Sequence, residues 1–214
     1  MYLPQQFEET RLDVLHQLIR SHPFGTFVIH GDAELIANHM PFLIDSREGP
    51  CGTLRAHVAR SNPVWKQFGK PVEALVVFQG PDSYITPSWY PSKHADGKAV
   101  PTWNYAVVHA YGQPRAIDDP AWLLAHVTQL TAEHEASQAL PWKVSDAPEG
   151  YRDQMISRIV GIEMPVSKIQ GNWKVNQNRP LADRLGVVAG LESRATEQSR
   201  AMAELVMQRA RSSR

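Results

Sequence analysis

The chain has 214 residues, of which 43% are hydrophobic and 21% charged, and this composition is typical of a folded globular protein and excludes long disordered regions. Lysine and arginine together number 22, and so do aspartate and glutamate, so the molecule lacks the basic excess that supplies most non-specific attraction to DNA. The single cysteine, Cys51, excludes an intrachain disulfide, and neither a signal peptide nor a hydrophobic run of the ~20 residues that span a membrane is visible, so a cytoplasmic protein is expected.

The first half of the chain predicts one helix followed by strands. Hydrophobic residues recur at helical spacing between residues 7 and 22, and Pro23 ends that helix. Strands are predicted over residues 24–29, 33–44, 51–59 and 73–79. The first two strands form a hairpin through a Gly31-Asp32 turn, and a short helical turn over residues 64–68 separates the last two.

The second half predicts further strands between helices. Residues 80–101 are rich in proline, serine, glycine and aromatic residues, which indicates a functional loop. Asp119 followed by Pro120 marks the start of a helix. The other predicted elements are strands over 102–117 and 162–172, a short helix over 146–155 and helical structure from residue 180 onward. Pro165 predicts an edge position or a bulge in the late strand.

The segment 52–66 carries the clearest chemical signal. Leu54, Ala56 and Val58 alternate with Arg55 and His57, so the two polar side chains share one face of the predicted strand. Arginine offers a planar fork of donors that matches phosphate oxygens, and hydroxyl or amide neighbours can complete the shell. The candidate phosphate ligands are therefore Arg55, His57, Arg60, Ser61 and Asn62, with Arg60 as the first choice. The alternative is an ordinary basic face with surface salt bridges.

Several blocks of sequence, taken together, resemble a known family. They are ANHMPF (37–42), the segment 52–66, VVFQGP (76–81), PSWYPSK (87–93), VPTWNY (100–105) and NWKVNQNRP (172–180). In this order they resemble the PaiB-type family of FMN-binding negative transcriptional regulators, and the likeness extends over residues 1–191. The resemblance implies a split β-barrel similar to that of pyridoxamine 5′-phosphate oxidase, in a homodimer that holds FMN at the subunit boundary.

The expected fold class is α+β and mainly β, a split barrel with flanking helices. We expect two parts, an FMN-binding domain over residues 1–190 and a C-terminal helical tail over 191–214. The tail mixes arginines with glutamates, which favours a solvated helix over a DNA-binding surface.

With this family in view, further residues become candidates for the flavin site. The backbone of His39 precedes a Met-Pro pair and could approach the flavin ring, although an isolated histidine is as often structural. Trp65 and Trp89 could stack on the ring and Gln79 could bind its polar edge, with core packing as the alternative for each tryptophan. Lys174, Gln177 and Arg179 are assigned to cofactor or dimer contacts.

Three functions remain open at this point. The first is a flavin-binding regulator whose FMN alters association with a partner or with DNA, although no DNA-contacting surface is recognisable. The second is a flavin-dependent oxidoreductase acting on a small substrate, for which no catalytic residue can be named. The third is haem handling through His39, His57 or His109. No metal site is expected, because His126 and His134 lie eight residues apart on one predicted helix.

Overall fold

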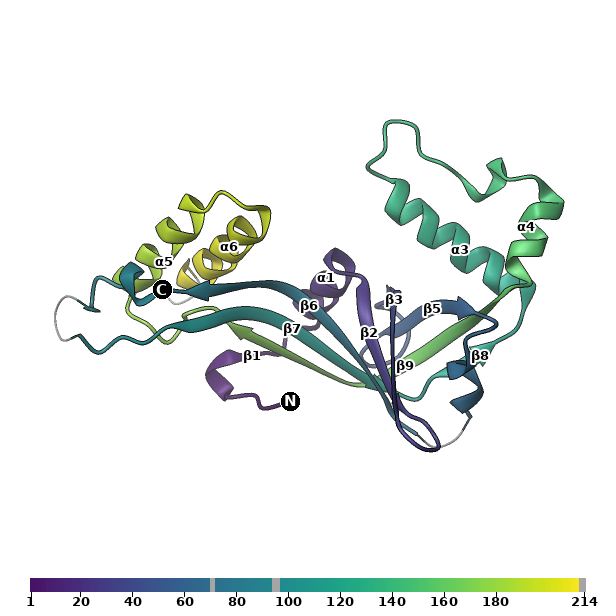
Figure 1. Ribbon diagram of the computed structural model, residues 1–214, viewed down its shortest axis with the longest axis horizontal. Coiled ribbons are helices and arrows are strands. Elements are labelled where there is room, and N and C mark those ends of the chain that lie inside the picture. The colour runs from purple at the N-terminus through teal and green to yellow at the C-terminus, as the bar shows by residue number, and fades with distance from the viewer. Residues whose placement is uncertain (70–71, 94–96, 212–214) are drawn as a thin grey trace. The chain divides into compact units, whose positions relative to one another are not determined.

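A computed structural model describes residues 1–69, 72–93 and 97–211 (Figure 1). Its strands are β1 (Glu8–Glu9), β2 (Phe24–His30), β3 (Leu35–Pro41), β4 (Leu43–Asp45), β5 (Thr53–Ala59), β6 (Ala74–Ile85), β7 (Thr102–Gly112), β8 (Arg115–Ile117) and β9 (Ile159–Lys174). Its α-helices are α1 (Leu12–Ser21), α3 (Pro120–Glu135), α4 (Glu149–Ile156), α5 (Leu181–Ser193) and α6 (Glu197–Arg211). Short 3₁₀ helices are η1 (Gln5–Phe7), η2 (Pro63–Gln67), η3 (Pro87–Trp89) and η4 (Val144–Asp146).

The described strands form a nine-stranded sheet in the order β3-β2-β6-β7-β9-β5-β4, with β1 and β8 both paired to β9. The pairings of known register are antiparallel. The predicted α+β, mainly β fold class is confirmed. The described residues divide into two compact units, one of Met1–Ser21, Gln79–His109 and Gln170–Arg214 (unit 1) and one of His22–Phe78 and Ala110–Ile169 (unit 2).

Unit 2 is built on two sets of paired strands. β2 and β3 form the predicted hairpin, in register from Phe24 opposite Pro41 to His30 opposite Leu35. β5 pairs with β9 along its whole length, and Leu54, Ala56 and Val58 are buried as the alternation of the sequence requires. The helix α3 begins where it was predicted, because Oδ1 of Asp119 accepts hydrogen bonds from the backbone N–H groups of Ala121 and Trp122.

Unit 1 has its own hydrophobic core beneath the last two helices. Ile85 and Tyr90 pack there against Val187 and Leu191 of α5 and Val206 of α6, all buried. Figure 1 shows α5 and α6 side by side. Position 190, where the predicted domain ends, lies inside α5. The division into a domain over 1–190 and a tail over 191–214 stays a prediction, and residues 212–214 of that tail lie outside the described residues.

Several element boundaries differ from those expected. The predicted strand 33–44 divides into β3 and β4, and the first α-helix starts at Leu12 rather than at residue 7. β6 continues to Ile85, through part of the predicted loop 80–101, of which residues 94–96 lie outside the described residues. Gly80 lies inside this strand and packs closely against Leu18. A Cβ at this position would come within 2.8 Å of the Leu18 side chain, so a glycine leaves the space that Leu18 needs.

Of the two positions that the sequence suggested for Pro165, an edge or a bulge, the edge is wrong, because β9 has β7 and β5 as neighbours, and the bulge stays a prediction. It stands opposite Thr53, where the pairing of β9 with β5 ends. A proline at the end of a pairing removes little of the hydrogen-bonded ladder. Pro165 is therefore tolerated because it lies where the pairing with β5 ends, and not because it lies at an exposed edge.

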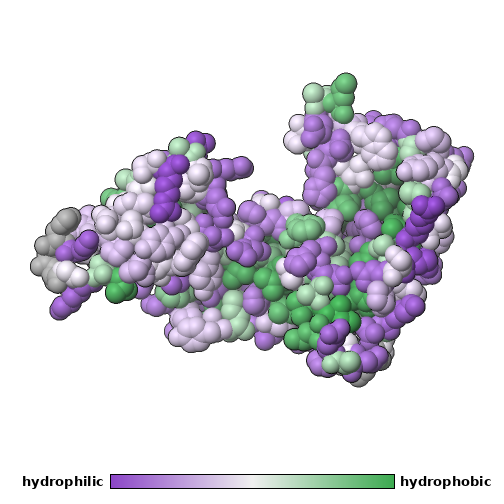
Figure 2. Space-filling model, in the orientation of Figure 1, coloured by the Kyte–Doolittle hydropathy of each residue, from purple (hydrophilic) through white to green (hydrophobic). Residues whose placement is uncertain are grey.

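The face drawn in Figure 2 is mostly hydrophilic, with hydrophobic residues gathered over strands β2 and β3. In these strands Phe24 and Leu35 are 66% and 69% exposed. Among the described residues, no helix has the length and apolar character needed to cross a membrane.

Candidate functional site

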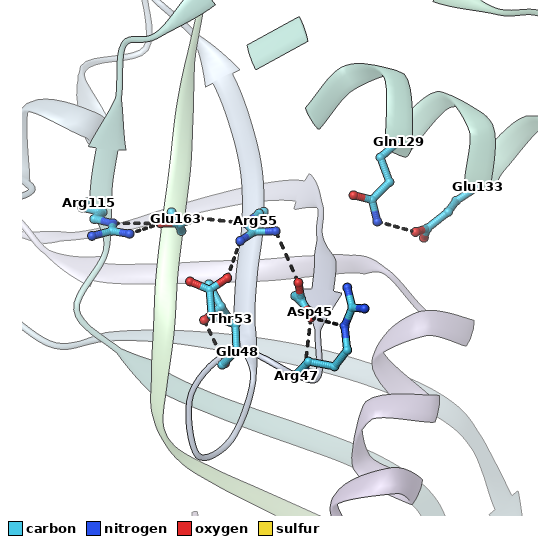
Figure 3. A network of polar contacts seen from close by, with 9 residues as sticks. All are labelled: Asp45, Arg47, Glu48, Thr53, Arg55, Arg115, Gln129, Glu133 and Glu163. Atoms are coloured by element: carbon cyan, nitrogen blue, oxygen red, sulfur yellow. Dashed lines mark hydrogen bonds and ion pairs between the residues drawn. The ribbon is translucent and has the colours of Figure 1, made fainter. Parts of the chain in front are cut away.

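Arg55 projects from β5 into a set of carboxylates (Figure 3). Its Nε donates to Oε2 of Glu163 at 2.9 Å, its Nη2 donates to Glu48, and its Nη1 lies 3.6 Å from Oδ2 of Asp45. Glu163, buried on β9, also accepts a 2.9 Å hydrogen bond from Nε of Arg115. Burial alone would raise the pKa of Glu163, but the hydrogen bonds from Arg115 and Arg55 hold that pKa below its ordinary value.

This network ties β5 to β4, β9 and β8. It also occupies the guanidinium group of Arg55 with acidic partners, so a phosphate would have to replace a carboxylate there. The phosphate role of Arg55 stays a prediction.

Arg60, the first choice for the phosphate, is similarly engaged. Its Nη1 and Nη2 donate to the two carboxylate oxygens of Asp118 at 2.8 and 2.5 Å. Its Nε donates to the carbonyl of Ser157 at 2.8 Å, and Nη2 also donates to that of Ile159 at 3.0 Å. The bidentate pair lowers the pKa of Asp118. In this arrangement Arg60 fastens the end of β5 to the segment before α3, and its phosphate role also stays a prediction.

The turn that leaves β5 meets strand β3 in unit 2. Nδ2 of Asn62 donates to Oδ1 of Asn38 at 2.7 Å, and Oδ1 of Asn62 accepts from the backbone N–H of Val64 at 3.0 Å. The indole Nε1 of Trp65 donates to the carbonyl of Arg60 at 3.1 Å, which fixes the ring beside the turn. Ser61 is exposed at this turn. The contact between Asn62 and Asn38 thus joins two blocks that the sequence separates by 24 positions.

His39, the residue after Asn38, stacks on Phe24 with ring centroids 6.4 Å apart. This contact places its ring at the β2–β3 hairpin. Its backbone role toward a flavin stays a prediction.

His57 faces a second histidine that the sequence did not mark as a partner. Its Nδ1 lies 3.2 Å from Nε2 of His126 on α3, and the ring of Trp122 stacks on His126 at 5.2 Å. Burial lowers the pKa of both imidazoles, and the charges of His57 and Arg55 help to lower that of His126 to about 4. Nδ1 of His126 is buried without a hydrogen-bond partner among the described residues. Both imidazoles are therefore neutral near pH 7.

The remaining candidates, Trp89 among them, lie in unit 1. Gln79 is exposed, and its Nε2 donates to Asp82 at 3.0 Å. Gln177 is engaged with backbone, since its Oε1 accepts from Val175 at 2.8 Å and its Nε2 donates to the carbonyl of Gln6 at 3.0 Å. Lys174 and Arg179 differ from these two because both line one pocket.

Trp89, considered for ring stacking, is packed within unit 1. A Cβ on Gly190 would come 2.2 Å from its ring, and the guanidinium of Arg194 lies 4.5 Å from the ring centroid. Core packing, the alternative stated for this tryptophan, describes these contacts.

Some residues at these places escaped sequence reasoning. Asp118 and Glu163 engage arginines that are far from them in the chain, and no local pattern announces such partners. Thr102 and Asn104, which line the pocket with Lys174, lie in the quoted block VPTWNY, so the block itself was the available signal.

Comparison with known proteins identifies the family of this chain. Residues 1–168 match the family model described as "Putative FMN-binding domain". The chain belongs to this family. The split-barrel flavin-binding fold and the FMN cofactor predicted from the sequence are thereby confirmed.

Two relatives cover nearly the whole chain. An uncharacterized protein, AN0679, from Emericella nidulans is 33% identical over 98% of this chain and 97% of its own length. The protease synthase and sporulation protein PAI 2 of Bacillus subtilis is 30% identical over 96% of each chain.

Solved structures show the same fold at low sequence identity. An FAD and heme binding protein from Mycobacterium smegmatis has a TM-score of 0.59 and 12% identity, covering 78% of this chain and 73% of that chain. The flavocytochrome Anf3 from Azotobacter vinelandii has a TM-score of 0.60 and 7% identity, covering 78% of this chain and 69% of that chain.

The residues present fit FMN in their chemistry. Its phosphate requires cations and hydrogen-bond donors, and its ring requires an aromatic surface and polar partners at one edge. The turn after β5 offers Ser61, Asn62 and Trp65, and the unit 1 pocket offers Lys174 and Arg179. Among the described residues, Oδ1 of Asn104 in that pocket is a buried acceptor without a partner, which a hydroxyl of a ligand would satisfy.

Proposed function

We propose that the protein is an FMN-binding negative transcriptional regulator of the PaiB type, acting as a homodimer in the cytoplasm. The sequence resemblance and the 30% identity to PAI 2 over 96% of each chain support the regulatory part of this proposal. The flavin-binding part rests on the family to which the chain belongs. When bound, FMN supplies a redox-active ring, and its occupancy or redox state would alter association with a partner or with DNA.

One observation carries the location that we propose for the flavin. The hydrogen bond between Asn62 and Asn38 brings the turn after β5 against the strand that bears His39. A ligand at this junction would meet the hydroxyl of Ser61, the indole of Trp65 and the backbone around His39. The neighbouring residues hold β5 and its exit turn in place. Arg55 pairs with Glu163, His57 faces His126, and Arg60, just after the strand, pairs with Asp118.

Flavin titration of the apoprotein tests this location. We expect FMN to bind with quenching of its fluorescence, and Asn62→Ala to weaken binding about fivefold, because a lost hydrogen bond amounts to about 1 kcal/mol. Gln129→Ala, which removes an exposed amide on α3, should bind FMN like the parent protein. A wild-type protein that takes up no FMN would refute the proposal, and equal affinity in a folded Asn62→Ala variant would move the flavin elsewhere.

Transcript measurements test the regulatory role without assuming direct DNA contact. Deletion of the gene should raise the transcripts of its targets, and the wild-type gene should restore repression while the Asn62→Ala gene should not. A deletion that leaves every transcript unchanged would contradict negative regulation.

Light scattering tests the homodimer. The FMN complex should have twice the chain mass of 24.0 kDa, and a mass of one chain would contradict the homodimer.

A further inference from the structure

A pocket of about 130 Å³ lies in unit 1, at the start of β7 and the end of β9. Its polar lining comes from Thr102, Asn104, Lys174, Asn176, Asn178 and Arg179. The last four of these residues follow position 168, where the match to the family model ends. The family model therefore covers only Thr102 and Asn104 of this polar lining.

The pocket carries two positive charges, and none of the described residues that line it is acidic. Nζ of Lys174 donates to Oγ1 of Thr102 at 2.7 Å, which uses one of the three donors of an ammonium group. The guanidinium of Arg179 lies over the ring of Tyr90 at 4.9 Å. Stacking of this kind uses the face of the guanidinium and leaves its N–H groups available in the plane. In contrast to Arg55 and Arg60, these two cations have no carboxylate partner among the described residues.

A buried chain of hydrogen bonds shapes the wall of the pocket. Nδ2 of Asn104 donates to Oδ1 of Asn176, whose Nδ2 donates to the hydroxyl of Tyr90 at 3.1 Å. Asn176 has a φ of 62°, a left-handed backbone conformation that non-glycine residues adopt rarely and that is concentrated at functional sites.

The same chain leaves one acceptor unsatisfied. Asn104 is 0% exposed, and its Oδ1 has no partner within the described part of the chain. An unsatisfied buried acceptor is unfavourable, and a ligand carrying a hydroxyl donor would satisfy it.

We propose that this pocket binds the phosphate monoester of a small hydroxylated molecule. Lys174 and Arg179 together balance the charge of about −1.5 to −2 that a phosphate monoester carries at pH 7, whereas a single carboxylate would leave one cation unmatched. Asn104 accepts a hydrogen bond from a ligand hydroxyl. Pockets that enclose whole ligands measure roughly 300–1,000 Å³, so this smaller pocket takes the phosphate end and the adjoining carbons.

This chemistry has two sources, the ribityl phosphate of FMN and a free sugar or polyol phosphate. The inference rests on the proposed function only in the first case. Calorimetry on apoprotein with FMN, riboflavin and ribose 5-phosphate distinguishes them. The variants are Lys174→Gln and Arg179→Gln, and Lys168→Gln serves as the control, since this lysine of the same strand contacts Tyr111 and does not line the pocket.

If FMN is the source, each pocket variant should lose about 10- to 100-fold in FMN affinity, which is the loss of one charged hydrogen bond of about 1.5–3 kcal/mol, with riboflavin affinity unchanged. If a free phosphate ester is the source, ribose 5-phosphate should bind the wild type and the control, and bind both pocket variants at least tenfold more weakly, while FMN affinity stays constant.

Unchanged affinity for both phosphorylated probes in two folded pocket variants would overturn the inference while leaving the flavin proposal intact. Conversely, Lys174-dependent binding of ribose 5-phosphate by a protein that ignores FMN would support the pocket and refute the flavin proposal. Circular dichroism and the melting temperature of each variant establish that it is folded.

Discussion

At the scale of single residues, the pair of His57 and His126 shows how burial decides a charge state. Their facing nitrogens are 3.2 Å apart, Trp122 stacks on His126, and the positive charge of Arg55 acts on His126. A proton on one ring would be held in a desolvated site close to a guanidinium, so both rings stay neutral. Because the unfolded chain exposes these rings to water, protonation favours unfolding.

The stability of the protein should therefore fall as the pH falls. The pKa of His126 falls from 6.5 to about 4 on folding, so its contribution to stability is fully present above pH 6.5 and is lost as the pH falls toward 4. The loss between pH 7 and 5 should be about 2 kcal/mol, measured as the free energy of unfolding in urea. His126→Gln should flatten this dependence. His134→Gln, on the exposed side of the same helix, should keep it, and equal slopes in all three proteins would contradict the prediction.

A glycine opposite this pair permits its packing. A Cβ at Gly161 on β9 would come 2.4 Å from the ring of Trp122, which stacks on His126. Gly161→Ala should therefore destabilise the protein by about 1–3 kcal/mol, because the indole must move within a packed site. Gly150→Ala is the matched control. Gly150 lies in the helix α4, and a Cβ at this position would meet nothing within 4 Å. It should instead stabilise by about 0.5–1 kcal/mol, and equal urea midpoints for the two variants would contradict this account.

At the scale of elements, Glu163 connects strands that are distant in the chain. It accepts hydrogen bonds from Arg55 on β5 and Arg115 on β8 while it is 4% exposed (Figure 3). Glu163→Gln should lower the free energy of unfolding by about 3 kcal/mol, because two arginines lose a buried partner.

Glu149→Gln is the control for that substitution. Glu149 pairs with Arg152 at 3.5 Å on α4 and is 83% exposed, and an exposed pair of this kind contributes below about 0.5 kcal/mol. Urea unfolding at pH 7 compares the two variants. A Glu163→Gln protein as stable as the control would show that the network adds nothing to stability.

The elements also show where sequence reasoning succeeds. The alternation in residues 51–59 predicted β5 and the shared face of Arg55 and His57, and the Asp119-Pro120 signal predicted the start of α3, because both depend on local geometry. The length of β6 was missed because the Gly80-Pro81 pair reads as a turn, whereas close packing against Leu18 is what requires the glycine.

The candidate site was only partly predictable for a related reason. Arginine in a strand indicates an anion, but the sequence does not say whether that anion is a phosphate or a carboxylate of the same chain. Asp118 reaches Arg60 from 58 positions away, and Glu163 reaches Arg55 from 108 positions away. Lys174 and Arg179, by contrast, were assigned to cofactor or dimer contacts with the family in view, and only the fold reveals their setting beside Asn104.

At the scale of the whole molecule, the balance of 22 basic and 22 acidic residues leaves little positive charge for DNA. Two arginines of this region, Arg194 after α5 and Arg209 in α6, are engaged within unit 1. Arg194 donates to the hydroxyl of Ser83 and the carbonyl of Tyr84, both at 3.0 Å, and Arg209 contacts the buried Glu9. Such side chains position the helices and are poorly placed to neutralise phosphates.

Because few arginines are left to neutralise phosphates, binding of the protein to DNA should depend only weakly on salt. The slope of log K against log salt concentration is about −0.9 for each phosphate neutralised, and proteins with 6–10 phosphate contacts lose about 10³–10⁵ in affinity between 50 and 200 mM salt. We expect a slope shallower than about −3 for promoter DNA, measured by fluorescence anisotropy of the FMN-bound protein over that range. A slope of about −6 or steeper would show that a basic surface forms after all, and direct repression would follow. A shallow slope together with intact repression in cells would instead mean that the flavin signal passes to DNA through a partner protein.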